Sequence, residues 1–151
     1  MDAAIIGLLG ALLGVILTYA FNRKNAFETR LHEARIETYK NFAAAAMEYR
    51  RAVMDEWFEG HRVDVRTDDD DVHRARGTAW SAYYGVRLLT SNDQTAERAR
   101  TALDNITALK KLENRRSLNE QGERCREDVE EFVRAAGEDV RSGGRWWSAA
   151  R

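Results

Sequence analysis

The sequence contains no proline and only one cysteine, Cys125, among its 151 residues. Proline is the strongest helix breaker, so its absence favours helix throughout and argues against β-sandwich and collagen-like folds. A single cysteine cannot form an internal disulfide, which excludes a disulfide-stapled secreted scaffold. The formal net charge is only −1, so nucleic-acid binding would require local clustering of basic residues.

One long segment lacks charge altogether. Residues 3–21 read AAIIGLLGALLGVILTYAF, and as a helix these nineteen residues would span about 28 Å, which matches a bilayer core. A cleaved signal peptide is the competing interpretation, with Thr18 and Ala20 as its small-residue site. Such peptides carry a basic n-region, which is missing here. We therefore predict an uncleaved transmembrane anchor over residues 1–21, embedded in the lipid bilayer.

The residues that flank this segment predict its orientation. Asp2 precedes the apolar run, whereas Arg23 and Lys24 follow it. Basic flanks stay in the cytoplasm, so we expect a cell-membrane protein with its N-terminus outside and its C-terminal body cytoplasmic. Arg23 and Lys24 are then candidates for contact with the membrane interface.

Small residues recur along one face of the predicted anchor, at Gly7, Gly10, Gly14 and Thr18. Gly10 and Gly14 form a GxxxG motif, which lets two helix backbones approach closely in lipid. The alternative is that glycine is simply common in membrane helices. Because the small residues form a single stripe, we predict a helix-association face and a homo-oligomer.

The remainder of the chain has the pattern of amphipathic helices, with apolar residues every three or four positions. We expect a polar helical stalk over residues 22–38, a bundle over 39–141 and a tail over 142–151. The predicted core positions, helix by helix, are Tyr39, Phe42, Ala46, Tyr49, Val53 and Trp57; Val72, Ala75, Ala79, Tyr83 and Val86; Ala96, Ala99, Leu103, Ile106 and Leu109; and Cys125, Val129, Phe132, Ala136 and Val140. This pattern predicts an all-α fold in which the transmembrane helix continues into an antiparallel four-helix cytoplasmic bundle.

Helix ends are predicted from capping residues and charges. The segment GHRVDVRTDDDD, residues 60–71, is expected to be a loop whose aspartates cap the next helix, because they lack the spacing of a calcium loop. The third helix is expected to run to about Arg116, with Lys110, Lys111 and Arg115 also complementing its C-terminal dipole. Ser117 and Glu120 fit a capping box for the last helix, which should end before Ser142.

The residues able to carry chemistry are few. A di-metal site in a helical bundle needs Glu-x-x-His pairs, and the sequence has none. Asp70 with His73 is the nearest, at a helix start, while Glu28 and His32 lie in the polar stalk. Cys125 lies on an apolar seam and is expected to be a buried structural thiol. No phosphate-binding loop, dinucleotide fingerprint or hydrolase motif occurs. We therefore predict no enzyme, no catalytic, cofactor-binding or metal-binding residues, and no nucleic-acid partner.

The stretch RIETYKNFAAA, residues 35–45, resembles the region after the anchor in uncharacterised single-span membrane proteins of actinobacteria and their phages. The resemblance covers about the first third of the chain. It implies a membrane-anchored helical body and carries no catalytic residues over to this sequence.

These observations lead to two functional hypotheses. The first is a non-enzymatic, single-pass interaction protein that self-associates and binds an unknown cytoplasmic protein. The alternative is a phage-type lysis or membrane-perturbing factor. The paired Trp146 and Trp147 of the tail have two interpretations as well, since they could lie at the membrane interface or cap the open end of the bundle.

Overall fold

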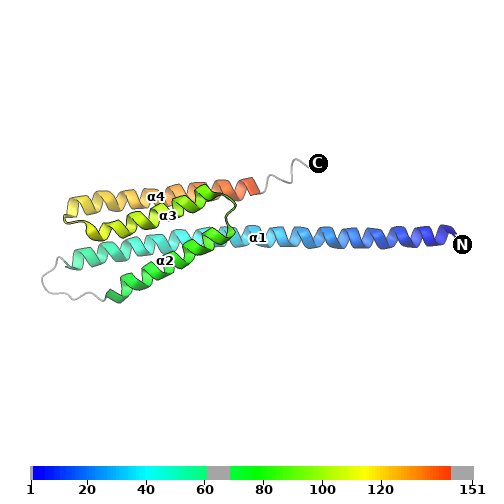
Figure 1. Ribbon diagram of the computed structural model, residues 1–151, viewed down its shortest axis with the longest axis horizontal. Coiled ribbons are helices and arrows are strands. Elements are labelled where there is room, and N and C mark those ends of the chain that lie inside the picture. Colours follow the sequence, from blue (N-terminus) through cyan, green and yellow to red (C-terminus); the bar gives the residue numbers. More distant parts are fainter. Residues whose placement is uncertain (1, 61–68, 144–151) are drawn as a thin grey trace. The chain divides into compact units, whose positions relative to one another are not determined.

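The computed structural model describes the backbone of residues 2–60 and 69–143, with side chains placed for residues 27–60 and 70–142. The described elements are all helical: α1 (Asp2–Gly60), α2 (Asp69–Leu89), α3 (Asp93–Ala108), the short 3-10 helix η1 (Leu109–Lys111) and α4 (Arg115–Gly143) (Figure 1). The all-α prediction is therefore confirmed for these residues. The chain divides into two compact units, residues 1–34 and 35–151.

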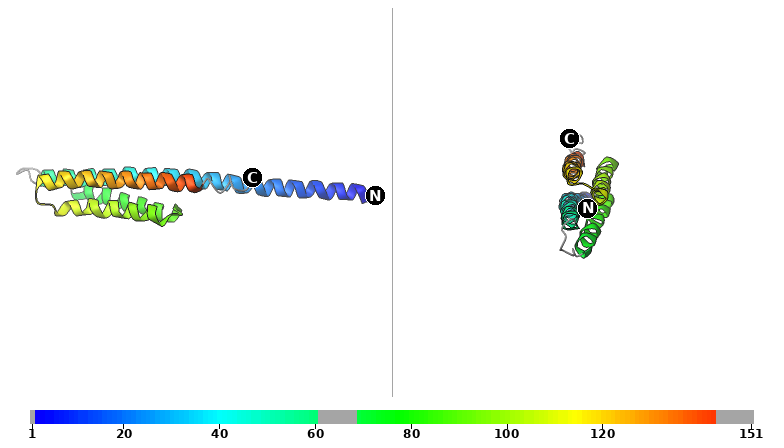
Figure 2. Two further views of the ribbon diagram at one scale, coloured as in Figure 1. Left: turned by 90° about the horizontal axis from the view of Figure 1, so that it is seen from above. Right: turned by 90° about the vertical axis from the view of Figure 1, so that its left-hand side faces the viewer.

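The second unit contains an antiparallel bundle formed by α2, α3, α4 and the part of α1 from Arg35 onward. Within it, α1 and α4 lie side by side in one layer and α2 and α3 form the other (Figures 1 and 2). Tyr39 pairs with Asp139 and Arg50 pairs with Gly122, so residue numbers rise along α1 as they fall along α4. This opposite order confirms the predicted antiparallel arrangement.

The bundle core is the apolar seam that the sequence pattern predicted. Eighteen of the 21 predicted core residues are buried, and the other three, Trp57, Ala75 and Val140, are partly buried and pack against the core. Phe132 is fully buried and contacts two aromatic rings of α1, at centroid distances of 4.5 Å from Phe42 and 6.0 Å from Tyr39. Burial of such side chains is the main stabilising contribution of the bundle.

Two glycines allow α1 to approach its neighbours closely. A Cβ atom at Gly85 of α2 would lie 3.2 Å from Cγ2 of Thr38, and one at Gly122 of α4 would lie 3.0 Å from Sδ of Met54. The carbonyl oxygen of Gly122 also accepts a hydrogen bond of 2.6 Å from Nε of Arg50. Larger residues would therefore compete for space with α1 at both crossings.

The structure corrects the predicted boundary between the third and fourth helices. Helix α3 ends at Ala108, η1 holds Lys110 and Lys111, and α4 already begins at Arg115. The predicted capping box is wrong, because the side-chain oxygen of Asn114 accepts the hydrogen bond from the Ser117 amide at 2.8 Å. An N-cap asparagine satisfies one of the free amides in the first turn.

The basic residues predicted to complement the C-terminal dipole of the third helix have other contacts in the structure. Lys110 forms an ion pair of 3.1 Å with Glu56 of α1, and the guanidinium of Arg115 lies 5.5 Å from the ring centre of Phe58. These two long side chains thus link η1 and the start of α4 to α1. The interpretation of Arg115 and Arg116 as C-terminal charges of α3 is wrong, since both belong to the first turn of α4.

Among the residues whose side chains the structure describes, no helical stretch combines the length and hydrophobicity that a bilayer span requires. The predicted anchor, residues 1–21, lies outside the residues whose side chains the structure describes. In the first unit, side chains are placed only from Phe27 onward, and Phe27 itself is exposed.

Candidate interaction surfaces

An apolar groove of about 400 Å³ runs between α1 and α4. Its lining is apolar except for Lys40 and the Tyr39 hydroxyl, and it consists of Ile36, Tyr39, Lys40, Ala43, Phe132, Val133, Ala136, Gly137 and Val140. Ile36 and Val133 remain 45% and 51% exposed. Apolar side chains left in contact with water beside a concave surface are typical of a binding site.

The helical register explains how the groove forms. On α4 its lining residues follow one another at positions 133, 136, 137 and 140, which is the spacing of a single helical face. Gly137 contributes no side chain, and the nearest atom to a Cβ placed there would be Nη1 of Arg141 at 3.3 Å. The guanidinium of Arg141 therefore lies beside the position at which α4 lacks a side chain.

A buried carboxylate lies next to this groove, at the end of the bundle that contains Tyr39. Asp139 is 1% exposed and accepts hydrogen bonds from three hydroxyl groups. The donors are Tyr39 of α1 at 2.5 Å, Thr90 at 3.2 Å and Ser91 at 2.9 Å, the last two from the α2–α3 connection. Asp139 thus joins α4 to α1 and to that connection.

The same contacts change the acidity of Tyr39. Burial of the phenol, reinforced by its hydrogen bond to Asp139, raises the pKa of Tyr39 from 10.0 to about 12. Both causes disfavour the phenolate, since ionisation would place a second negative charge beside the carboxylate in a poorly solvated site. The neutral phenol therefore remains a hydrogen-bond donor over the physiological range.

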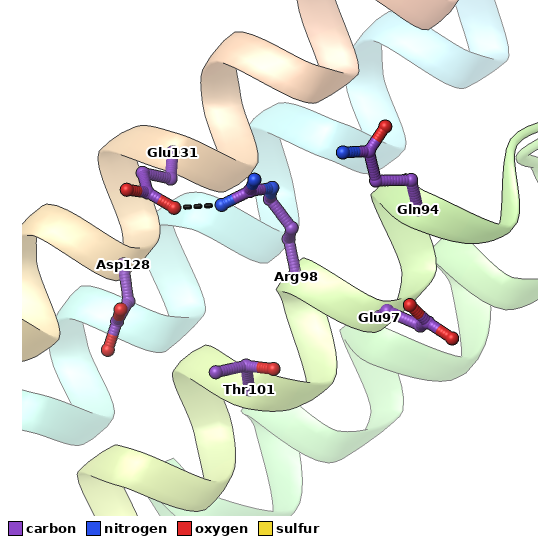
Figure 3. A pocket seen from close by; sticks show the side chains of 6 residues that line it. All are labelled: Gln94, Glu97, Arg98, Thr101, Asp128 and Glu131. Carbon is purple, nitrogen blue, oxygen red and sulfur yellow. Dashed lines mark hydrogen bonds and ion pairs between the residues drawn. The ribbon is translucent and has the colours of Figure 1, made fainter.

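A second, polar cleft of about 240 Å³ lies between α3 and α4. Figure 3 shows its six lining side chains: Gln94, Glu97, Arg98 and Thr101 from α3, with Asp128 and Glu131 from α4. Arg98 and Glu131 form an ion pair across it, and Asp128 accepts a hydrogen bond of 2.7 Å from the Asn105 amide. The cleft is a polar seam between two helices, in which the guanidinium is already paired.

Cys125 is fully buried in the bundle core, as predicted. Burial, together with the nearby Asp128, raises the pKa of its thiol from 9.0 to about 11, while Arg50 opposes the shift. The thiolate is the reactive form of cysteine, so these surroundings make Cys125 chemically inert in the folded protein.

Among the described side chains, no group of three or more His, Cys, Asp or Glu residues is arranged to hold a metal ion. Asp70 and His73 are both exposed in the first turns of α2, and Asp71 forms an ion pair with Arg74. His32 is also exposed, on α1.

The site residues predicted for the membrane lie outside the described side chains. This holds for the association face of Gly7, Gly10, Gly14 and Thr18, for Arg23 and Lys24, and for Trp146 and Trp147. Sequence reasoning in turn missed Asp139, although it follows Ala136 by three residues and so falls on the apolar stripe of α4. An acidic residue on an apolar stripe is the signal that could have identified this cluster.

Together, the described residues define an antiparallel helical-bundle protein with an apolar groove on one pair of helices and a polar cleft on another. Comparison with known families shows that residues 36–140 match the KilB plasmid transfer protein family. Because the match covers more than half of the chain, the protein belongs to this family. No curated protein and no solved structure matches the chain.

Proposed function

We propose that this chain is a non-enzymatic, single-pass membrane-anchored interaction protein that acts in plasmid transfer. The observation that carries the proposal is the family match over residues 36–140, which lies within the compact unit that starts at Arg35. Plasmid transfer moves DNA between cells, so a protein that acts in it has reason to be located at the cell membrane.

The apolar run of residues 3–21 supports the anchor, since its length suits a bilayer core. Arg23 and Lys24 directly follow this run, which supports a cytoplasmic bundle. Gly7, Gly10, Gly14 and Thr18 would let two anchors pack together. The bundle then supplies the surface for a cytoplasmic protein partner.

The direct test measures the frequency of plasmid transfer from a donor cell whose plasmid lacks the gene for this chain. Supplying the wild-type chain should restore transfer. A variant with Leu9→Arg and Leu13→Arg should be absent from the membrane fraction, because each central arginine costs about 3 kcal/mol of insertion free energy. This variant should also fail to restore transfer. Leu88→Arg is the matched control, since Leu88 is 83% exposed on α2 and lies outside the predicted span.

Self-association is tested with Gly10→Ile and Gly14→Ile, each of which should weaken dimerisation by about 1 kcal/mol or more in a membrane two-hybrid assay. Transfer that proceeds normally without the chain would contradict the proposed role. If expression of the chain instead breached the membrane while transfer stayed unchanged, the alternative of a phage-type lysis factor would be favoured.

A further inference from the structure

The α1–α4 groove has a candidate occupant in the same chain. Among the described residues nothing covers Ile36 and Val133, which remain about half exposed at its rim. The residues that follow α4 include Trp146 and Trp147, two large aromatic side chains that are unfavourable in full contact with water. We propose that residues 145–151 dock along this groove, with the two indole rings lying on its apolar floor.

The place where α4 ends favours this occupant. The groove-lining positions 133, 136, 137 and 140 share one face of the helix, and the next position on that face is residue 144, four residues after Val140. Helix α4 ends at Gly143. It therefore ends within one turn of the groove residue Val140. Gly144 follows in the sequence, a residue type that readily terminates helices and reverses the chain.

The length of the segment also fits the groove. Along α4, Val140 lies about 4.5 Å and Val133 about 15 Å before Gly143. An extended chain carries Trp147 up to about 13 Å and Ser148 up to about 17 Å from Gly143. Both rings can thus cover the stretch from Val140 to Gly137, and Ser148 can reach Val133.

Tethering favours the chain's own segment over a separate molecule. A segment joined to the groove by a short linker is present there at an effective concentration in the millimolar range. The shape of the floor suits flat rings as well, because Gly137 has no side chain and the neighbouring Ala136 and Ala43 have small ones. This inference concerns the bundle alone and does not depend on the proposed membrane anchor.

The test uses the full chain with Val133→Cys, studied in whichever cell fraction contains it. The rate of maleimide labelling at the introduced thiol is measured by peptide mass spectrometry. If the segment is docked about nine-tenths of the time, this rate should rise about tenfold when Trp146 and Trp147 are both replaced by Ala. Val133 is half exposed, so its replacement should leave the fold intact, as circular dichroism can verify. Buried Cys125 should react far more slowly.

The matched control places the cysteine at Arg134, which is exposed on the neighbouring face of α4. Its labelling should be the same with and without the tryptophans. As a second measurement, Val133→Cys combined with Ser148→Cys should form a disulfide within one chain on oxidation, whereas Arg134→Cys combined with Ser148→Cys should not.

Three outcomes would overturn the proposal. Equal labelling of the Val133→Cys thiol with and without the tryptophans would show that the segment does not cover the groove. A dimer-sized disulfide product would show that a second copy occupies it. Quenching of Trp146 and Trp147 fluorescence by brominated lipid, with the thiol at position 133 unprotected, would place the rings in the membrane interface instead.

Discussion

At the two ends of the bundle, different kinds of interaction fix the connections between the helices. At one end the buried Asp139 accepts three hydroxyl hydrogen bonds and fixes the α2–α3 connection, residues 90–92. At the other end the indole of Trp57 donates one hydrogen bond of 2.7 Å to the carbonyl oxygen of Leu112, in the α3–α4 connection. Trp57 also packs edge-on against Phe58, with ring centres 5.4 Å apart.

This difference predicts unequal tolerance of change. A buried carboxylate is stable only while its hydrogen-bond donors are in place, because an unpaired buried charge has a large desolvation cost. The Trp57 end instead depends on a neutral hydrogen bond, on the partly exposed Lys110–Glu56 ion pair and on aromatic contacts, with no buried charge among them. The end that contains Asp139 should therefore define the arrangement of the helices more strictly, and it borders the apolar groove.

The largest expected effect is that of Asp139→Ala. The substitution leaves the hydroxyls of Tyr39 and Ser91 without their acceptor, whereas Thr90 keeps the carbonyl oxygen of Asn92 at 3.1 Å. The loss of hydrogen bonds to a charged group should lower the free energy of unfolding by about 3 kcal/mol. Urea denaturation of the fragment that starts at Asn22 measures this value.

Trp57→Phe is the comparison at the opposite end. It removes the neutral hydrogen bond from the indole to the carbonyl oxygen of Leu112 and retains an aromatic ring, so it should cost about 1 kcal/mol. Equal losses for the two variants would mean that the ends do not differ in the way the contacts suggest.

An effect of about 2 kcal/mol is expected from alkaline pH. The pKa of Tyr39 is about 12 in the folded protein against 10.0 for an ordinary tyrosine, so folding favours the protonated phenol. The contribution to stability is fully present below pH 10 and is lost as the pH rises from 10 to 12, by about 2 kcal/mol or slightly more.

The control for this titration is Tyr39→Phe, which cannot ionise at that position. Denaturation of both proteins between pH 9 and 12 should show a steeper loss of stability for the wild type. Parallel curves would contradict the assignment of the alkaline loss to Tyr39.

Much of the bundle was predictable from residue spacing. The seam from Tyr39 to Val53 and its counterparts on the other helices are buried as expected, since amphipathic periodicity reports which face is removed from water. The boundary near Asn114 was not predictable in this way, because a run of good helix formers surrounds it and a single side-chain cap decides where α4 begins. Local capping outcompeted the continuation of the helical pattern.

The candidate surfaces were harder to predict, because each depends on residues distant in the sequence. The groove combines Ile36 with Val133, and the polar cleft pairs Arg98 with Glu131. Asp139 meets Tyr39, one hundred positions away. Periodicity identifies the faces of single helices, but which faces meet is decided by the packing of the whole bundle.

The smallest expected effects concern the two glycines at the close crossings, one near each end of the bundle. Gly85→Ala would place its Cβ 3.2 Å from Cγ2 of Thr38. Threonine is β-branched and has restricted χ1 freedom, so the helices must move apart, and this strain should outweigh the gain in helix propensity.

At the other end, Gly122→Ala would place its Cβ 3.0 Å from Sδ and 3.1 Å from Cε of Met54. Methionine is unbranched and adapts readily, so the side chain can shift and the variant should be neutral or slightly more stable. Gly77→Ala is the reference, because nothing lies within 4 Å of its Cβ position and alanine should stabilise α2 there by up to about 1 kcal/mol. Thermal denaturation should therefore rank Gly77→Ala as the most stable of the three variants and Gly85→Ala as the least. If Gly122→Ala were instead the most damaging, the Trp57 end of the bundle would be the more strictly packed one.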